Sequence, residues 1–93
     1  MDIEVSIEPA PDGWYCAVTL RAGGESRYQV HVSRVDLARL APGAADPADL
    51  VRASFAFLLE RESPSSILRR FDLRVIGSYF PDYEATMLAR LGR

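Results

Sequence analysis

The chain has 93 residues, a length that accommodates one folded domain with one hydrophobic core. Hydrophobic residues make up 48% and charged residues 26%, with a formal net charge of -2, and this balance excludes an intrinsically disordered chain. The apolar stretches are too short to cross a bilayer, and the start Met1-Asp2-Ile3-Glu4 lacks the basic and apolar segments of a signal peptide. We therefore expect a single cytoplasmic domain over residues 1–93.

Three stretches in the first third of the chain alternate between apolar and polar residues. This period of two is typical of strands that bury one face. The stretches cover about residues 2–8, 14–21 and 25–32. A four-residue loop over 9–12 and a three-residue loop over 22–24 are predicted between them, with Gly24 in the left-handed conformation. The chain therefore begins with a three-stranded antiparallel meander.

The two loop lengths place all apolar strand residues on one face of this meander. With these loops Ile7 faces Trp14, and Val18 faces Tyr28. The apolar face is expected to pack against helices. The opposite face carries Glu4, Tyr15, Thr19, Arg21, Arg27, Gln29 and His31. That second face is expected to be solvated or to meet a partner.

The remainder of the chain predicts helices that pack on the sheet. Ser33 and Asp46 are predicted N-caps because their side chains can accept backbone N–H groups of a first helical turn. The predicted helices cover about residues 34–41, 47–62, 64–70, 73–79 and 81–91. The helix over 47–62 places Phe55 and Leu58 in one apolar stripe and is the main core helix. The expected fold class is α+β, with the C-terminal helices packed on one face of the meander.

No combination of residues in the sequence predicts a catalytic, cofactor-binding or metal site. The single cysteine, Cys16, lies in the apolar row, where a free thiol packs as a small hydrophobic group. His31 points outward, and no Cys or close Asp is placed to form a nucleophile pair with it. One Cys and one His cannot build a closed zinc site. We therefore predict that the chain is not an enzyme and needs no cofactor.

Two groups of residues favour binding to another protein. One is the open side of the third strand, with Arg27, Gln29 and His31, because edge strands pair readily with another chain. The first strand is also an edge, but its acidic side chains would repel a second copy of the same strand. The other is an aromatic group around Pro81, whose rings and hydroxyls suit an interface. Its members are Tyr79, Phe80 and Tyr83. The predicted function is a small interaction or accessory module that binds another protein or forms a homodimer.

The alternative function is nucleic-acid binding through a cluster of arginines. Arg69, Arg70 and Arg74 lie around the junction of two predicted short helices, an arrangement similar to a helix-turn-helix that could meet phosphates. The net charge of -2 and the nearby Asp72 count against this hypothesis. A nucleic-acid partner therefore ranks behind a protein partner.

Two parts of the sequence resemble known families. The first lies between Asp49 and Glu84 and includes the segments Phe57-Leu58-Leu59-Glu60-Arg61-Glu62, Ser66-Ile67-Leu68-Arg69-Arg70-Phe71-Asp72 and Tyr79-Phe80-Pro81-Asp82-Tyr83-Glu84. This stretch resembles a family of short uncharacterised bacterial proteins. The resemblance implies no activity. The segment Asp12-Gly13-Trp14-Tyr15 is similar to antitoxins of the HicB type, whose sheet is followed by a helix. The proline-glycine-cysteine turn of those antitoxins is missing after the second strand, so this resemblance implies a fold and an antitoxin-like regulator only by analogy.

Overall fold

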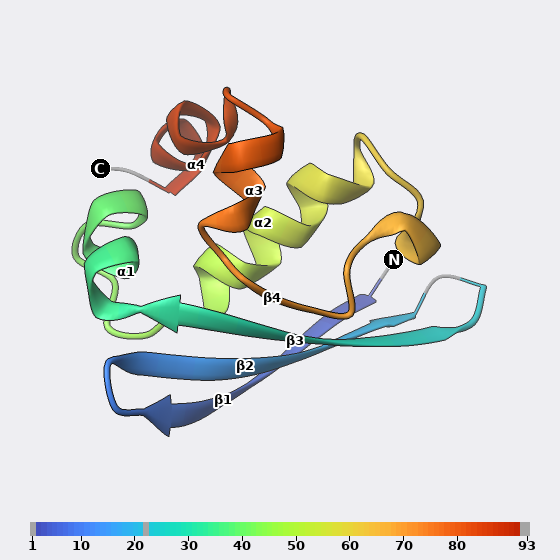
Figure 1. Ribbon diagram of the computed structural model, residues 1–93, viewed down its shortest axis with the longest axis horizontal. Coiled ribbons are helices and arrows are strands. Elements are labelled where there is room, and N and C mark those ends of the chain that lie inside the picture. The colour runs from blue at the N-terminus through green and yellow to red at the C-terminus, as the bar shows by residue number, and fades with distance from the viewer. Residues whose placement is uncertain (1, 22, 92–93) are drawn as a thin grey trace.

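The computed structural model describes residues 2–21 and 23–91, and these form an α+β fold with all helices on one face of a sheet (Figure 1). The sheet has the order β1-β2-β3-β4. Its strands are β1 (Asp2–Ala10), β2 (Gly13–Arg21), β3 (Glu25–Ser33) and β4 (Arg70–Asp72). The helical elements are α1 (Arg34–Leu40), α2 (Ala48–Leu59), the 3-10 turn η1 (Pro64–Ser66), α3 (Val75–Tyr79) and α4 (Tyr83–Leu91). In the described part of the chain, the face of the sheet opposite the helices is open (Figure 1).

The antiparallel meander is confirmed, and the pairing of β2 with β3 has the predicted register. Val18 faces Tyr28, and Cys16 faces Val30, so the apolar row is buried while Tyr15 is 44% exposed on the open face. The three-residue connection includes Ala22, which lies outside the described residues. Gly23, with φ 71°, adopts the left-handed helical conformation that was expected of Gly24, whose φ is 154°.

The pairing of β1 with β2 differs by two residues from the predicted register. Ile7 faces Cys16 and Pro9 faces Trp14, so the connection is a two-residue turn over 11–12 and not a four-residue loop. Because the difference is an even number, every apolar residue stays on the predicted face. Pro9 fits inside the strand because β1 is an edge, where a missing N–H removes no ladder hydrogen bond.

The prediction of a helix over residues 64–70 is wrong. Only η1 is helical, after which the chain extends and enters β4, which pairs in parallel with β3. The Gln29 N–H donates to the Arg69 carbonyl at 2.8 Å, and the Leu73 N–H donates to the His31 carbonyl at 2.9 Å. A proline after serine starts a 3-10 turn as well as an α-helix, so the start signal alone did not distinguish them. The remaining predicted helices are present, with ends that differ by up to three residues.

The strand β4 also changes which edge of the sheet is open. The second half of β3, which was expected to be an edge, has its backbone groups bound by β4. The Tyr28 hydroxyl donates to the Pro64 carbonyl at 2.7 Å and holds η1 beside the first half of β3. The nine-residue strand β1 is therefore the long open edge.

The core lies between the sheet and α2. The Phe55 ring is fully buried, with its centroid 5.2 Å from that of Tyr28 and 6.1 Å from that of Phe71. The Ser54 hydroxyl donates to the Leu50 carbonyl at 2.7 Å, so the buried Tyr83 hydroxyl, also 2.7 Å away, donates to Ser54. Burial raises the pKa of Tyr83. This hydroxyl pair fixes α4 against α2.

Gly13 occupies a position where the backbone approaches β3 closely. A Cβ on Gly13 would overlap the Val32 carbonyl oxygen and lie 2.8 Å from the Ser33 Cα. We expect Gly13→Ala to lower the free energy of unfolding by about 1–3 kcal/mol, the usual cost of overpacking. Denaturant titration measures this change. Gly77→Ala is the control, since its nearest contacts would be ordinary at 3.9 Å and alanine favours a helix. Equal stability of Gly13→Ala and the native chain would contradict the close approach.

Candidate binding surfaces

The open face of the sheet is organised in rows that cross the strands. The middle row consists of the register partners Ser6, Ala17, Gln29 and Arg70. The rows on either side carry larger side chains: Glu4, Thr19 and Arg27 on one side, and Glu8, Tyr15, His31 and Asp72 on the other. Because Ser6 and Ala17 are small, the middle row is lower than its neighbours. The result is a hollow of about 450 Å³, hereafter the trough, whose lining also includes Arg69.

His31 lies in the row beside the trough and is held between two aspartates. Its Nδ1 is 2.8 Å from Asp72 Oδ2, and its Nε2 is 2.9 Å from Asp12 Oδ1. The Tyr15 ring packs against it, with 5.3 Å between the ring centroids. The expectation that no aspartate is close to His31 is therefore wrong. The unforeseen strand β4 supplies Asp72, and the short β1–β2 turn supplies Asp12.

The two aspartates favour the charged form of His31. Both ring nitrogens must carry a hydrogen in order to donate to two carboxylates, which is the imidazolium state. The hydrogen bond with Asp72, followed by that with Asp12, raises the pKa of His31. The same bond to His31 lowers the pKa of Asp12. In this arrangement His31 ties the β1–β2 turn to β3 and β4.

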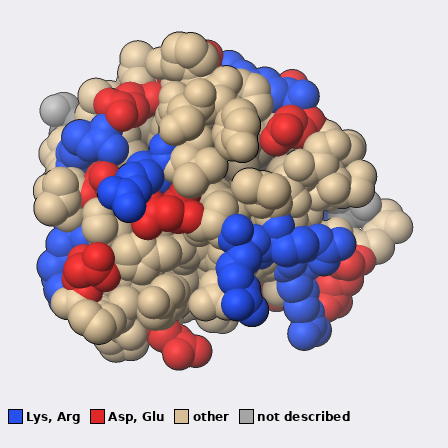
Figure 2. Space-filling view, viewed as in Figure 1, with Lys and Arg blue, Asp and Glu red and all other residues tan. Residues whose placement is uncertain are grey.

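The arginines of the trough differ from the others in their partners. Among the ten arginines in residues 2–21 and 23–91, seven have a side-chain nitrogen within 4.0 Å of a carboxylate oxygen. The other three are Arg34, Arg69 and Arg70, and of these Arg69 and Arg70 both line the trough. Figure 2 shows a group of basic side chains at the lower right, over the region where the chain enters β4 in Figure 1. Two arginines without a carboxylate within ion-pair distance among the described residues therefore line the trough.

The structure brings together two of the three arginines proposed for nucleic acid. Arg74 lies outside the trough and pairs with Asp72, with 3.6 Å between Nε and Oδ1. The expected helix-turn-helix arrangement is wrong, since Arg70 begins a strand and η1 ends before Arg69.

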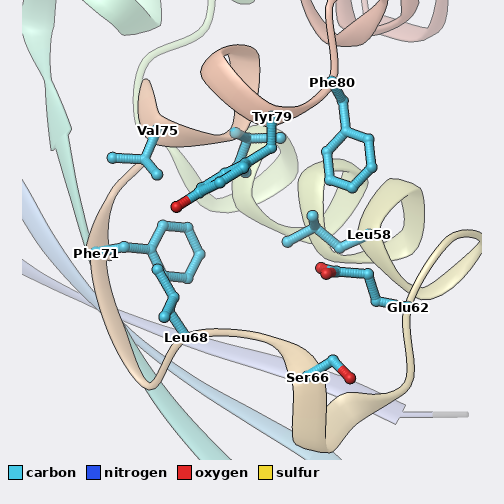
Figure 3. Close-up of a pocket in the computed structure, with 9 residues that line it drawn as sticks. Leu58, Glu62, Ser66, Leu68, Phe71, Val75, Tyr79 and Phe80 are labelled. Atoms are coloured by element: carbon cyan, nitrogen blue, oxygen red, sulfur yellow. The ribbon is translucent and has the colours of Figure 1, made fainter.

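A second hollow, of about 430 Å³, lies between the end of α2, the segment from η1 to β4, and α3 (Figure 3). Its lining consists of Leu58, Glu62, Ser66, Leu68, Phe71, Val75, Ile76, Tyr79 and Phe80. We call it the apolar hollow. In Figure 3 the Phe71 ring and the Glu62 carboxylate point into this space, and the Tyr79 ring lies along its wall. Tyr79 is 69% exposed and Leu68 is 53% exposed, so large apolar side chains meet solvent at this site.

The predicted partner-binding residues are divided between the two surfaces and the core. Arg27 and Gln29 line the trough, and His31 lies beside it. The apolar hollow is lined by Tyr79 and Phe80. Tyr83, which was expected at the surface, is only 1% exposed and belongs to the core. Sequence reasoning missed Leu68, Phe71 and Glu62 as surface neighbours of Tyr79, because their approach depends on β4.

The comparisons with known proteins give no relative for this chain. It matches no family model, no curated protein and no solved structure. None of the helices in the described residues has the length and apolar character that crossing a membrane requires. The His, Cys, Asp and Glu residues of that same part of the chain form no group of three that could hold a metal ion.

The raised pKa of His31 predicts a pH-dependent contribution to stability. A group with a raised folded-state pKa stabilises the fold fully below its unfolded pKa, here 6.5, and loses this contribution as pH rises through the higher folded value. We therefore expect the native chain to lose stability relative to His31→Gln as the pH rises from about 5 to about 9. Urea titrations at each pH measure the difference. Parallel stability curves for the two chains would show that the two aspartates do not favour the charged ring.

Proposed function

We propose that this protein is a non-enzymatic interaction module that associates with a second copy of itself through the apolar hollow. The observation that carries the proposal is the exposure of Tyr79 and Leu68 beside an apolar space that no described residue fills. An exposed apolar patch with a polar rim is characteristic of protein interaction sites. Glu62 and Ser66 provide polar groups among the lining residues.

The apolar hollow has the self-complementary form that a symmetric dimer requires. In a two-fold contact the same patch must supply both the protruding side chain and the space that receives it. Tyr79, which forms part of the wall of the hollow but is 69% exposed, would supply the first, and the 430 Å³ hollow would supply the second. A two-fold axis beside Tyr79 would insert each ring between Leu58 and Phe71 of the other copy. Buried aromatic anchors of this kind provide most of the binding energy in many interfaces.

Glu62 gives this contact a polar partner. Its carboxylate forms no hydrogen bond or ion pair with any described residue, and it points into the apolar hollow in Figure 3. An entering tyrosine hydroxyl could donate to it, which would satisfy both groups when water is excluded. The proposed dimer therefore exchanges two hydrogen bonds between Tyr79 and Glu62, one on each side of the axis.

The alternative route to a dimer, pairing of sheet edges, is less favourable. The open edge is β1, and its outward side chains include Asp2, Glu4 and Glu8. Two antiparallel copies of this strand would bring like charges together. The second half of the β3 edge, around Gln29 to His31, is paired with β4. The apolar hollow is therefore the favoured surface.

Removal of the Tyr79 ring tests the proposed dimer. We expect the native chain to have a mass near twice 10.3 kDa in light scattering coupled to size exclusion. Tyr79→Ser should raise the dissociation constant at least about tenfold, as expected for an anchor residue. Tyr79→Phe should weaken association less, since it keeps the ring and loses only the bond to Glu62. Glu62→Gln should retain most of the affinity, since an amide oxygen also accepts a hydrogen bond.

Val35→Ser is the matched control for this experiment. Val35 is 74% exposed on α1 and does not line the apolar hollow, so its removal should leave the mass unchanged. A mass near 10.3 kDa at every concentration would contradict self-association. Equal dissociation by Val35→Ser and Tyr79→Ser would contradict the location of the interface.

A further inference from the structure

We propose that the trough on the open face binds a small phosphorylated ligand of the nucleotide type, with its phosphate at Arg69 and Arg70 and its planar ring beside Tyr15. This site is separate from the apolar hollow, because the trough lies on the open face of the sheet and the apolar hollow lies on the helical side. The two proposals can therefore succeed or fail independently.

The basic end of the trough has the chemistry that a phosphate group requires. Arg69 and Arg70 are adjacent, and neither is within ion-pair distance of a carboxylate in the described residues, whereas the nearby Arg27 pairs with Glu25 at 2.8 Å. Guanidinium groups present several N–H donors in a planar fork that matches phosphate oxygens. An anion at this end would therefore meet two uncompensated charges.

The backbone of both arginines is fixed by β3, and the Arg69 guanidinium also has a ring contact. Arg70 is the register partner of Gln29, and the Arg69 carbonyl accepts the Gln29 N–H at 2.8 Å. The Arg69 guanidinium carbon lies 5.7 Å from the centroid of the Tyr28 ring, a cation–π distance. A donor held as Arg69 is held loses less conformational entropy when a ligand binds.

The floor of the trough offers further free polar groups. The side chains of Ser6 and Gln29 make no hydrogen bond to any residue in the described part of the chain. A glutamine amide both donates and accepts, so Gln29 can bind the polar edge of a heterocyclic ring. The short side chains of Ser6 and Ala17 leave the space that a ligand would occupy.

Tyr15 places the ring of the ligand at a suitable distance from the phosphate. It is 44% exposed, lines the trough, and is held in position by His31. Tyr15 is on β2 and Arg70 is on β4, two strands apart, which corresponds to about 10 Å. A mononucleotide can extend over such a distance between its base and its phosphate. Stacking of a base on an aromatic side chain would add to the binding energy.

The charges on β1 favour a free small ligand over a nucleic-acid strand. Glu8 lines the trough, and Glu4 lies in the row on the other side of the middle row. A strand that continued from the arginines across the sheet would bring its next phosphates toward these carboxylates. The overall charge of -2 adds no general attraction for a polyanion. The trough therefore accommodates one phosphate group better than several.

Calorimetry and amide chemical-shift titrations at low salt test the site, with four probes. These are adenosine 5′-monophosphate, adenosine, inorganic phosphate and a short single-stranded oligodeoxyadenylate. We expect the monophosphate to bind at least about tenfold more tightly than adenosine or inorganic phosphate, because only it engages both ends of the trough. The shifted amides should be those of β2, β3 and β4 around the trough. The oligodeoxyadenylate should bind no more tightly than the monophosphate.

Three variants locate the binding. Arg70→Ala should weaken binding of the monophosphate at least about tenfold, whereas Arg52→Ala removes an equal charge from α2 and should change it less than about twofold. Ala17→Leu fills the trough without changing charge and should also weaken binding. Circular dichroism confirms that each variant folds.

Specific outcomes would overturn the proposal. These are no binding of the monophosphate, equal binding of adenosine, or equal loss of affinity in Arg52→Ala and Arg70→Ala. Tighter binding of the oligodeoxyadenylate would reject the free ligand in favour of single-stranded nucleic acid. Because the mass of the Arg70→Ala chain in light scattering is expected to equal that of the native chain, failure at the trough is distinguishable from failure of the dimer.

Discussion

The parallel pairing of β4 with β3 is the interaction on which both candidate surfaces depend. Because side chains alternate along a strand, Arg70 and Asp72 project onto the open face of the sheet while Phe71 projects toward the helices. Arg70 closes the basic end of the trough, and Asp72 binds His31. Phe71 contacts the Phe55 ring and forms a wall of the apolar hollow. Three residues thus contribute to two surfaces of opposite chemistry.

The parts of the fold that sequence could predict are those with repeated local signals. The alternation around Val18 and Val30 extends over whole strands, so the buried face was predictable even where the β1–β2 register was not. Ser33 caps α1 by accepting a hydrogen bond from the Asp36 N–H, as its position before the helix indicated. The prediction of Asp46 as N-cap is wrong by one residue: the N-cap of α2 is Pro47, although the Asp46 carboxylate accepts the Ala48 N–H. Such features need only neighbouring residues.

The trough and the apolar hollow could not be predicted because they arise from contacts distant in sequence. A three-residue strand is too short to show a period, so nothing in residues 70–72 distinguished β4 from a helix. The approach of Asp12 and Asp72 to His31 requires both that strand and the correct turn length. The burial of Tyr83 likewise follows from the placement of Ser54 across the interface between α2 and α4. In each case the decisive partner is supplied by tertiary structure.

The shortness of β4 provides a physical route by which the two proposed surfaces would be coupled. It has only three register pairs with β3, and segments with so few backbone contacts open at a lower free energy than the core. Opening of β4 would displace Arg70 and Phe71 together, which removes the basic end of the trough and a wall of the apolar hollow at once. A ligand that binds to one face only while β4 is paired with β3 would increase the fraction of molecules in which β4 is paired. In that fraction the binding surface on the other face is also complete. By linkage the coupling free energy is equal in both directions, so if both proposed sites bind, occupancy of one face would strengthen binding at the other to the same degree.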